Sequence, residues 1–429
     1  MGFLHEHIIL PLSDFATRQH IYRDMRFLLQ SEQWSEQQML DYRCEKLREI
    51  VNLAIAHVPY YRNLGIKRDS IRSFDDLRKL PIVSKKIIRA RGLIDFTTDN
   101  YPVSRRLSMH SSGSTGEPFT YYTSPEATSI NTAAKLLTWY KAGYRLGDRY
   151  MNIKRSARET LAKRVQDWVN RSSYVTFYSL DDAHLHNILQ QIEREKPLFL
   201  RSYPAPLSLL AHYKNHHPEF TYCPTRVFTT GSNLTNTARE EVERAFGCDI
   251  IDSYSCEGTM NTYETPMHDG YHQTLPYGVM EVLDDTGTPV VNGIGRVVST
   301  DFWNIAQPFI RYDTLDLVEM KNGVIHRIIG HDCETIIDVH GKRLTVYTLD
   351  EFLSRCDDEG NELVNAFQVV YRKDKSIIFR LVVTPFFTKK YEEEITNYWT
   401  EELGCPVRVE KVCQIPLMHN NKQLVTISE

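Results

Sequence analysis

The segment Ser111–Pro118 reads SSGSTGEP and is the first stretch whose residue types could bind a ligand. Gly113 and Gly116 can adopt positive φ angles, so the backbone can approach a ligand closely and turn several N–H groups and hydroxyls toward it. That set of donors suits a triphosphate. Glu117 follows the second glycine, so the segment lacks the lysine of the Walker loop. Turns and flexible linkers have a similar composition, and the rest of the chain must distinguish these alternatives.

Two further candidates lie at the ends of predicted strands. The run RVFTT leads into Gly231 and Ser232, and residues 249–254 predict a strand that ends shortly before Glu257. Ligands of α/β proteins bind at the carboxyl ends of parallel strands, so both ends lie where a ligand would. A carboxylate oxygen is the kind of ligand that Mg²⁺ prefers, which makes Glu257 a candidate metal ligand. A glutamate beside a glycine is also common in a solvated loop.

A second pair of carboxylates lies in a β-rich stretch, residues 277–318. Asp313 and Asp316 come after the run PFIRY. A carboxylate can accept hydrogen bonds from both hydroxyls of a ribose, and on chemistry alone either aspartate could do so. The two residues therefore remain alternatives at this point.

Strands and helices alternate between residues 127 and 254, which predicts an α/β fold with parallel sheets covered by helices. The chain has 429 residues, more than one hydrophobic core usually serves, so at least two domains are expected. We place the boundary at residue 331. Residues 1–330 would form a large domain, and residues 331–429 a compact α+β domain whose final loop contains Lys422.

Composition excludes several classes of function. A net charge of −4 argues against a surface that binds nucleic acid, and no run of about 20 apolar residues suggests membrane insertion. The eight cysteines are scattered without a CxxC pair, so we interpret them as reduced thiols of a cytoplasmic protein. His184 and His186 lie two apart on a predicted helix, and we expect both on its surface rather than at a metal.

Five motifs occur in the order SSGSTGEP, TTGSN, YSCEG, PFIRYDTLDLV and IIGHD, followed by a lysine near the C-terminus. This order resembles the adenylate-forming superfamily, and most of all its phenylacetate-CoA ligase-like branch, which includes the CapK-type proteins of polysaccharide gene clusters. The segments HVPYYRNLG and DLRKLPIVSKK are similar to the same branch. The resemblance covers almost the whole chain. It implies an α/β fold with a large multi-sheet N-terminal domain and a small mobile α+β C-terminal domain.

The resemblance also implies a two-step reaction that uses ATP and Mg²⁺. A small-molecule carboxylate would attack the α-phosphorus of ATP to give an acyl-adenylate and pyrophosphate. The thiol of CoA or of a carrier protein would then displace AMP. Glu257 would hold Mg²⁺, and Lys422 would reach the α-phosphate and carboxylate oxygens. A lysine suits that task because a compact ammonium on a flexible stem can follow charge as it develops.

The same resemblance assigns a nucleotide site. Gly231 and Ser232 would lie along the adenine with Tyr254 stacked on it, and the family's spacing selects Asp316 rather than Asp313 for the ribose. His331 stands where the family usually has an arginine, after the glycine of its domain-boundary motif, and is assigned to the same site. The residues that would cradle the β- and γ-phosphates are Ser111, Ser112, Gly113, Ser114, Thr115 and Gly116.

Other departures from the family pattern keep two alternative functions open. Cys256 stands where a serine or threonine is usual, and Asn421 where glycine normally precedes the lysine. An adenylyltransferase would instead leave AMP on a hydroxyl acceptor. A degenerate protein of an envelope-polysaccharide pathway would bind the nucleotide without turnover, which His331 and Asn421 would fit. The sequence identifies neither the carboxylate, nor the acceptor, nor the oligomeric state.

Overall fold

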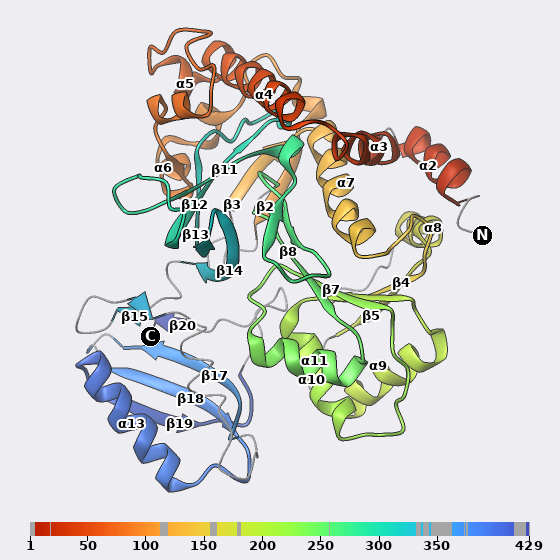
Figure 1. Cartoon of the computed structure of the whole chain (residues 1–429), viewed down its shortest axis with the longest axis vertical. Coiled ribbons are helices and arrows are strands. Elements are labelled where there is room, and N and C mark those ends of the chain that lie inside the picture. The colour runs from red at the N-terminus through yellow and green to blue at the C-terminus, as the bar shows by residue number, and fades with distance from the viewer. Residues whose placement is uncertain are drawn as a thin grey trace.

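The structure is a computed structural model (Figure 1). It describes residues 5–17, 19–111, 119–154, 161–177, 182–256, 258–331, 336–337, 343–344, 363–372, 374, 376–415 and 426–428. Its largest element is a 12-stranded sheet in which β11-β12-β13-β14-β10-β9-β8-β7-β6-β4-β5 are neighbours in that order and β1 pairs with β13. A second, smaller sheet belongs to the C-terminal part of the chain. The expected α/β class is therefore confirmed.

One half of the large sheet is parallel, as the alternation of strands and helices predicts. Its strands are β4 (Tyr150–Lys154), β5 (Ser172–Thr176), β6 (Phe199–Ser202), β7 (Arg226–Thr230) and β8 (Ile250–Tyr254). They pair in the order β5-β4-β6-β7-β8, with every pairing parallel. Their carboxyl ends therefore meet along one edge, where α/β sheets bind ligands.

The other half of the sheet is mainly antiparallel, which the alternation did not predict. Its strands are β9 (Thr262–Glu264), β10 (Tyr271–Gln273), β11 (Gly278–Leu283), β12 (Gly293–Asp301), β13 (Tyr312–Lys321) and β14 (Val324–His331). The strand β8 joins the two halves because it pairs in parallel with β7 and antiparallel with β9. The short β1 (Val83–Ser84) adds to β13 in parallel.

Helices cover both faces of the parallel half because its strands are apolar on both sides. Phe199 and Phe228 face α7, whereas Leu200 and Val227 pack into the core beneath α9, α10 and α11. The helices of the described chain are α2 (Leu10–Thr17), α3 (Ile21–Ser31), α4 (Glu36–His57), α5 (Pro59–Arg62), α6 (Lys85–Arg91), α7 (Pro125–Lys141), α8 (Leu161–Asn170), α9 (Asp182–Glu195), α10 (Pro204–Asn215), α11 (Asn236–Phe246) and α13 (Lys389–Leu403). Shorter turns are η1 (His5–Ile9), η2 (Asp75–Lys79), η3 (Leu93–Phe96), η4 (Val103–Arg105) and η5 (Leu275–Tyr277).

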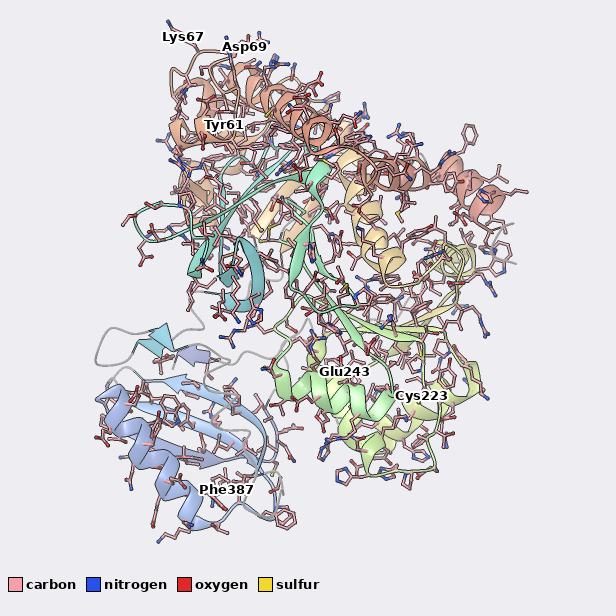
Figure 2. The ribbon with its side chains drawn as sticks, in the orientation of Figure 1. Tyr61, Lys67, Asp69, Cys223, Glu243 and Phe387 are labelled. Atoms are coloured by element: carbon pink, nitrogen blue, oxygen red, sulfur yellow. The ribbon has the colours of Figure 1, made fainter. Side chains whose placement is uncertain are left out.

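Local sequence sets the ends of the helices near the ligand edge. The Ser124 hydroxyl accepts a hydrogen bond from the Ala127 N–H, and Pro125 occupies the first turn of α7. The Thr235 hydroxyl caps α11 in the same way, by accepting from the Ala238 N–H. Glu243 on α11 (Figure 2) accepts from the Ile250 N–H at 3.0 Å, which fixes the start of β8.

The N-terminal helix α4 packs on the antiparallel half of the sheet. A capping box of Ser35 and Gln38 starts this helix, and its apolar side lies in the same core as β11, β12 and β13. Leu47 and Ala54 are fully buried there. The helix α4 therefore serves as scaffold for the sheet. Within the described ranges, no helix is both long and apolar enough to cross a membrane.

The C-terminal part has a core of its own. Its sheet has the order β19-β18-β17-β20, built from β17 (Val364–Tyr371), β18 (Ile377–Val383), β19 (Val407–Lys411) and β20 (Thr426–Ser428). A small sheet pairs β15 (Ile336–Ile337) with β16 (Arg343–Leu344). Trp399 on α13 is 1 % exposed and packs against Phe379 of β18. The expected α+β character of this region is thereby confirmed, and Figure 1 shows its helix and sheet as one layered unit.

One surface prediction is wrong. His184 lies on α9 but is only 9 % exposed, and its ring N–H donates to the Thr176 carbonyl at 3.0 Å. The helix packs this side against the end of β5, which the two-residue spacing of the histidines does not reveal. His186 forms contacts with Tyr213 and Gln190 at the side of the same helix.

Candidate nucleotide and acyl site

The glycine-rich segment connects the two strands of a hairpin. The strands β2 (Leu107–Ser111) and β3 (Phe119–Thr123) are antiparallel, and Ser111 pairs with Phe119 at their ends. The Asn304 amide donates to the Tyr122 carbonyl at 2.9 Å, which ties the hairpin to the turn after β12. The helix α7 begins directly after β3. The candidate phosphate loop therefore joins two paired strands, and the second of them leads directly into a long helix.

The loops after β7 and β8 lie side by side at the carboxyl edge. Thr230 and Ser253 are register partners, so Gly231 and Tyr254 are at matching positions of the two strand ends. Gly231 has a φ of +82°, and a Cβ atom there would lie 2.6 Å from the Tyr203 ring. Only glycine satisfies both the backbone angle and the close approach of that ring. The TTGSN motif is therefore tightly packed at this point.

The structure also brings Tyr254 and Asp316 together. The Tyr254 hydroxyl donates to a carboxylate oxygen of Asp316 at 2.6 Å, although 62 residues separate them. Both side chains are largely shielded from solvent. Burial raises the pKa of Tyr254 well above its usual value, and the neighbouring Asp316 charge raises it further. The phenol therefore stays protonated and continues to donate through the neutral range.

The local geometry of β13 separates the two candidate aspartates. Asp313 accepts from the Leu315 N–H at 3.0 Å and forms an ion pair with Arg296 at 3.5 Å. Leu315 has a φ of +63°, a conformation that is costly for a leucine. This kink turns the chain between the two carboxylates, so that Asp316 faces Tyr254 while Asp313 faces Arg296. The sequence carries no signal that predicts a positive φ at this leucine.

One further hydrogen bond closes the site. The Asn233 amide donates to the Ile329 carbonyl at 2.8 Å, which holds the loop after β7 against β14. Asp316 is the register partner of His331 at the end of β14. The backbone positions of Gly231, Tyr254, Asp316 and His331 therefore lie in one region, at the ends of β7, β8 and β14.

A buried polar network supports the strand that carries Tyr254. Asp252 of β8 accepts from the Thr229 hydroxyl at 2.6 Å and from the Tyr271 hydroxyl at 2.7 Å. Burial raises the pKa of Asp252, and the nearby charge of Glu264 raises it further. Arg239 donates to both oxygens of Glu264 and thereby compensates the second acid. Sequence reasoning missed this network, whose members come from five separate elements.

Several candidates lie outside the described residues, namely Glu257, Lys422, Ser112, Gly113, Ser114, Thr115 and Gly116. The residues on either side of Glu257 are described: Cys256 is buried, and Gly258 has a φ of +71°. The Gly258 carbonyl accepts from the Tyr277 hydroxyl, which in turn accepts from Asn131 of α7 at 2.9 Å. The loop that bears Glu257 is thus anchored to α7. Within the described ranges, no cluster of three or more histidine, cysteine, aspartate or glutamate side chains could hold a metal.

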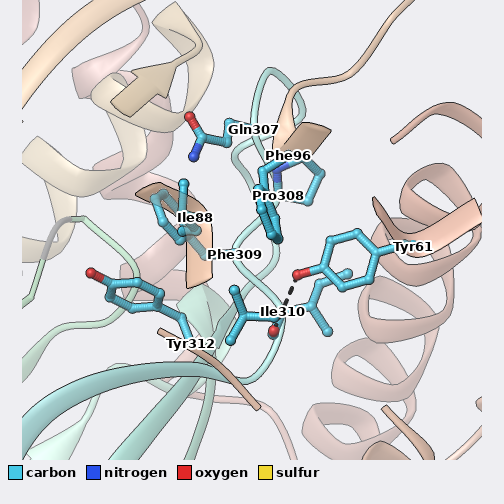
Figure 3. A pocket seen from close by; sticks show the side chains of 9 residues that line it. Tyr61, Ile88, Phe96, Gln307, Pro308, Phe309, Ile310 and Tyr312 are labelled. Atoms are coloured by element: carbon cyan, nitrogen blue, oxygen red, sulfur yellow. Dashed lines mark hydrogen bonds between the residues drawn. The ribbon is translucent and has the colours of Figure 1, made fainter. Parts of the chain in front are cut away.

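An apolar crevice elsewhere in the large unit has no room for a ligand. Figure 3 shows its lining, in which the Tyr61 hydroxyl donates to the Ile310 carbonyl at 3.3 Å. Ile88 and Phe96 are each at most 2 % exposed, and the space between these side chains is too small for a water molecule. The crevice is a packing feature of the core between α5, α6 and β13.

Known proteins resemble the chain in sequence. Protein CapK of Staphylococcus aureus is 22% identical over 73% of this chain and 71% of its own length. The phenylacetate-coenzyme A ligase of Escherichia coli (strain K12) is 24% identical over 68% of this chain and 71% of its own length. No protein-family model matches the chain.

Solved structures share the fold. The crystal structure of 2-hydroxyisobutyryl-CoA ligase in the postadenylation state superposes with a TM-score of 0.70 at 17% identity, over 90% of this chain and 88% of that one. The O-succinylbenzoate coenzyme A synthetase of Bacillus subtilis, in complex with AMP, superposes with a TM-score of 0.53 at 16% identity, over 74% of this chain and 67% of that one. The chain is thus similar in sequence to CapK and to a phenylacetate-coenzyme A ligase, and it shares its fold with CoA ligases and synthetases.

Proposed function

We propose that this protein is a ligase that uses ATP and Mg²⁺ to activate a small-molecule carboxylate as an acyl-adenylate, and then transfers the acyl group to a thiol of CoA or a carrier protein. The observation that carries the proposal is the hydrogen bond between Tyr254 and Asp316 beside Gly231, at the carboxyl edge of β7 and β8. The names of the relatives support it, because one is a phenylacetate-coenzyme A ligase and the fold neighbours include CoA ligases.

The site suits an adenosine. Tyr254 offers an aromatic face for the adenine, and the loop at Gly231 and Ser232 offers backbone groups along its edge. Asp316 offers a carboxylate with lone pairs beyond the one that Tyr254 uses, and these can accept from the ribose hydroxyls. Asp313 is already engaged by Arg296 and the Leu315 N–H. The geometry therefore favours Asp316 for the ribose, in agreement with the family spacing.

The first step needs charge control at the phosphates. A carboxylate oxygen would attack the α-phosphorus of ATP, and the bond from that phosphorus to the bridging oxygen would break as pyrophosphate leaves. The loop Ser111–Gly116 would hold the β- and γ-phosphates with its N–H groups and hydroxyls. Glu257 offers a hard oxygen ligand for Mg²⁺, which would neutralise charge on the leaving pyrophosphate when bound. The Lys422 ammonium would stabilise the charge on the α-phosphate and the attacking carboxylate.

The second step transfers the acyl group to sulfur. A thiolate would attack the acyl carbon, the C–O bond to the phosphate would break, and AMP would leave with that electron pair. Lys422 belongs to the first step, and we place it in a C-terminal domain of residues 331–429 that would move between the steps. The fold neighbour 2-hydroxyisobutyryl-CoA ligase is described with its acyl-AMP and with CoA, which supports CoA as one acceptor to test.

Trapping the activated acid with hydroxylamine tests the proposal. The protein is incubated with ATP, Mg²⁺, hydroxylamine and pools of aryl, amino and aliphatic acids, and the products are identified by mass spectrometry. We expect AMP and the hydroxamate of one acid in equal amounts, both lost in Asp316→Ala. A stable AMP ester of a hydroxyl compound would identify an adenylyltransferase instead. ATP binding without any turnover would identify a nucleotide-binding protein.

A further inference from the structure

Two basic side chains lie near one another between α7 and the parallel half of the sheet. Lys135 lies on α7, and Arg201 lies one residue before the end of β6. The Arg201 guanidinium stands 5.5 Å from the centre of the Trp139 ring, one helical turn beyond Lys135. Trp139 is itself fixed by stacking on Phe228 of β7 at 4.7 Å. The aromatic pair therefore holds the guanidinium near the carboxyl edge.

The two cations have no acidic counterpart in the described chain. Within the described ranges neither Lys135 nor Arg201 forms an ion pair, and both are only partly accessible to solvent. Burial lowers the pKa of Lys135 to about 8, and the nearby Arg201 charge contributes to that drop. Two like charges in a partly buried place are costly unless an anion joins them. This unfavourable pair of charges lies at the edge of the candidate site.

A third residue, Asn152, is an independent indication that a ligand binds here. Asn152 on β4 is the register partner of Arg201 and is 1 % exposed. Burial raises the pKa of Tyr150, and Arg201 and Asn152 oppose that rise, so these side chains lie near one another. Neither polar atom of the Asn152 amide nevertheless has a well-directed hydrogen bond in the described part of the chain. The amide therefore has donor and acceptor capacity that the described residues do not fully use.

The place of this cluster relates it to the nucleotide. Tyr203 lies two residues after Arg201 on the same side of the chain, and its ring is the one that closes on Gly231. The cluster thus lies near the proposed adenine loop, because Arg201 and Tyr203 are at the same end of β6. A tail of the bound acid that reached past this loop would meet the cluster.

On the basis of the proposed function, we infer that Lys135, Arg201 and Asn152 bind a second anionic group of the acid substrate, so that the protein activates acids with a negatively charged tail. Lysine and arginine would pair with that group, and the asparagine amide would donate a further hydrogen bond to it. A neutral tail would leave both cations and the amide uncompensated.

Matched pairs of acids test the inference. Carboxylate-dependent exchange of labelled pyrophosphate into ATP is measured with succinate against butyrate, glutarate against pentanoate, and isophthalate against benzoate. We expect the charged member of at least one pair to have a kcat/KM at least about 10-fold higher, because a hydrogen-bonded charge contributes that much to binding. Lys135→Met and Arg201→Met should each abolish that preference. Lys141→Met is the control, because Lys141 is on the same helix but pairs with Glu32.

A charge reversal keeps the test independent of lost folding. Lys135→Glu should shift the preference toward a cationic tail, with 5-aminopentanoate gaining on glutarate by about 10-fold or more. A wild-type protein that prefers pentanoate to glutarate would overturn the inference while leaving the proposed activity intact. So would a lysine substitution that raises the KM for ATP and leaves the ratio between acids unchanged, because the cations would then serve the triphosphate.

A binding measurement separates the inference from the proposed activity. Titration calorimetry of glutarate and pentanoate is carried out in the presence of a non-hydrolysable ATP analogue. Glutarate binding that disappears in Lys135→Met, without exchange by any acid, would support the anion site and contradict the ligase function. Equal binding of both acids to wild type and variant would overturn the anion site.

Discussion

Asp316 is the residue on which recognition of the nucleotide should depend most. Its carboxylate is buried beside Tyr254 and is oriented by the kink at Leu315. The hydroxyl of Tyr254 uses one oxygen of this carboxylate, and the remaining lone pairs are those that a ribose would meet. The two side chains should therefore contribute unequally, the carboxylate by hydrogen bonding and the tyrosine chiefly by its ring.

Asp316→Asn should raise the KM for ATP by about 10-fold, because a charged acceptor of two ribose hydroxyls becomes a neutral one. Tyr254→Phe should raise it by less than about 3-fold, since the aromatic face remains. Steady-state kinetics of pyrophosphate release measures both. Equal losses in the two variants would contradict a direct ribose contact by Asp316.

Gly231 offers a test of close packing against the nucleotide loop. Gly231→Ala places a methyl group 2.6 Å from the Tyr203 ring, which must shift, and forces alanine to a φ of +82°. Gly287→Ala is a matched control, because Gly287 has the same φ of +82° but nothing within 4 Å of the added atom. We expect the control to lose about 1 kcal/mol of stability. Gly231→Ala should lose more and should also weaken ATP binding, as urea unfolding and nucleotide titration would show.

If Gly231→Ala bound ATP as tightly as the wild type, the loop at Gly231 would not belong to the nucleotide site.

Lys135 should reduce the stability of the unliganded protein at neutral pH. Burial and Arg201 lower its pKa to about 8 from a usual value of 10.5, so the unfolded chain binds more protons between these values and stability rises with pH there. Below pH 8 the penalty is fully present. Lys135→Met should therefore raise the free energy of unfolding at pH 7 by about 1 kcal/mol, with a gain that fades toward pH 10.5.

Lys141 on the same helix should have the opposite effect on the free energy of unfolding. Burial acts to lower its pKa, but the hydrogen bond to Glu32 raises it above the usual value, so the charged form is favoured on folding. Lys141→Met should then lose stability at pH 7. Urea unfolding at pH 7 and pH 10 compares the two variants, and a loss of stability in Lys135→Met at pH 7 would contradict the account of the cation cluster.

At the scale of elements, α7 connects the glycine-rich segment, the cation cluster and the loop of Glu257. It starts at the Ser124 cap, carries Lys135, and holds the Gly258 loop through Asn131. A shift in the first turn of this helix would therefore move all three parts of the site. Its cap is therefore a place where a small change in stability should also change function.

Ser124→Ala should reduce the free energy of unfolding by about 1 kcal/mol through loss of the cap to Ala127. It should also raise the KM for ATP, because the phosphate loop precedes this turn. Ser35→Ala removes the cap of α4 and should lose a similar amount of stability with no change in the KM. Chemical unfolding and kinetics on both variants check this. Identical kinetic effects would mean that the loss at Ser124 reflects stability alone.

Sequence patterns predicted these elements where local signals are strong. The alternating strands and helices around β7 and β8 and the α+β character of the C-terminal region follow from periodicity and turn residues. The pairing of β10 with β14 did not follow, because strand pairing between distant segments leaves no local signal. The Tyr254–Asp316 hydrogen bond, the Leu315 kink and the Asn152–Arg201 pairing are also long-range or strained, and only the folded chain displays them.

At the scale of the whole molecule, two separate cores divide the proposed chemistry. The nucleotide residues belong to the large unit, whereas the chain that carries Lys422 runs between β19 and β20 of the C-terminal sheet. That sheet has its own buried centre around Phe379 and Trp399. Binding of ATP and the first chemical step should therefore be separable by substitution. Loss of Lys422 should abolish the first chemical step without weakening the binding of ATP.

Exchange of labelled pyrophosphate into ATP, dependent on an added carboxylate, tests the central claim most directly. Wild type and Lys389→Ala should exchange equally, because the Lys389 side chain is 87% exposed on α13. Lys422→Ala should lose at least about 100-fold in exchange, as expected when a charge that stabilises a transition state is removed, and should still bind ATP. Full exchange in Lys422→Ala, or none in wild type with any acid, would contradict the assignment of this protein as a carboxylate-activating ligase.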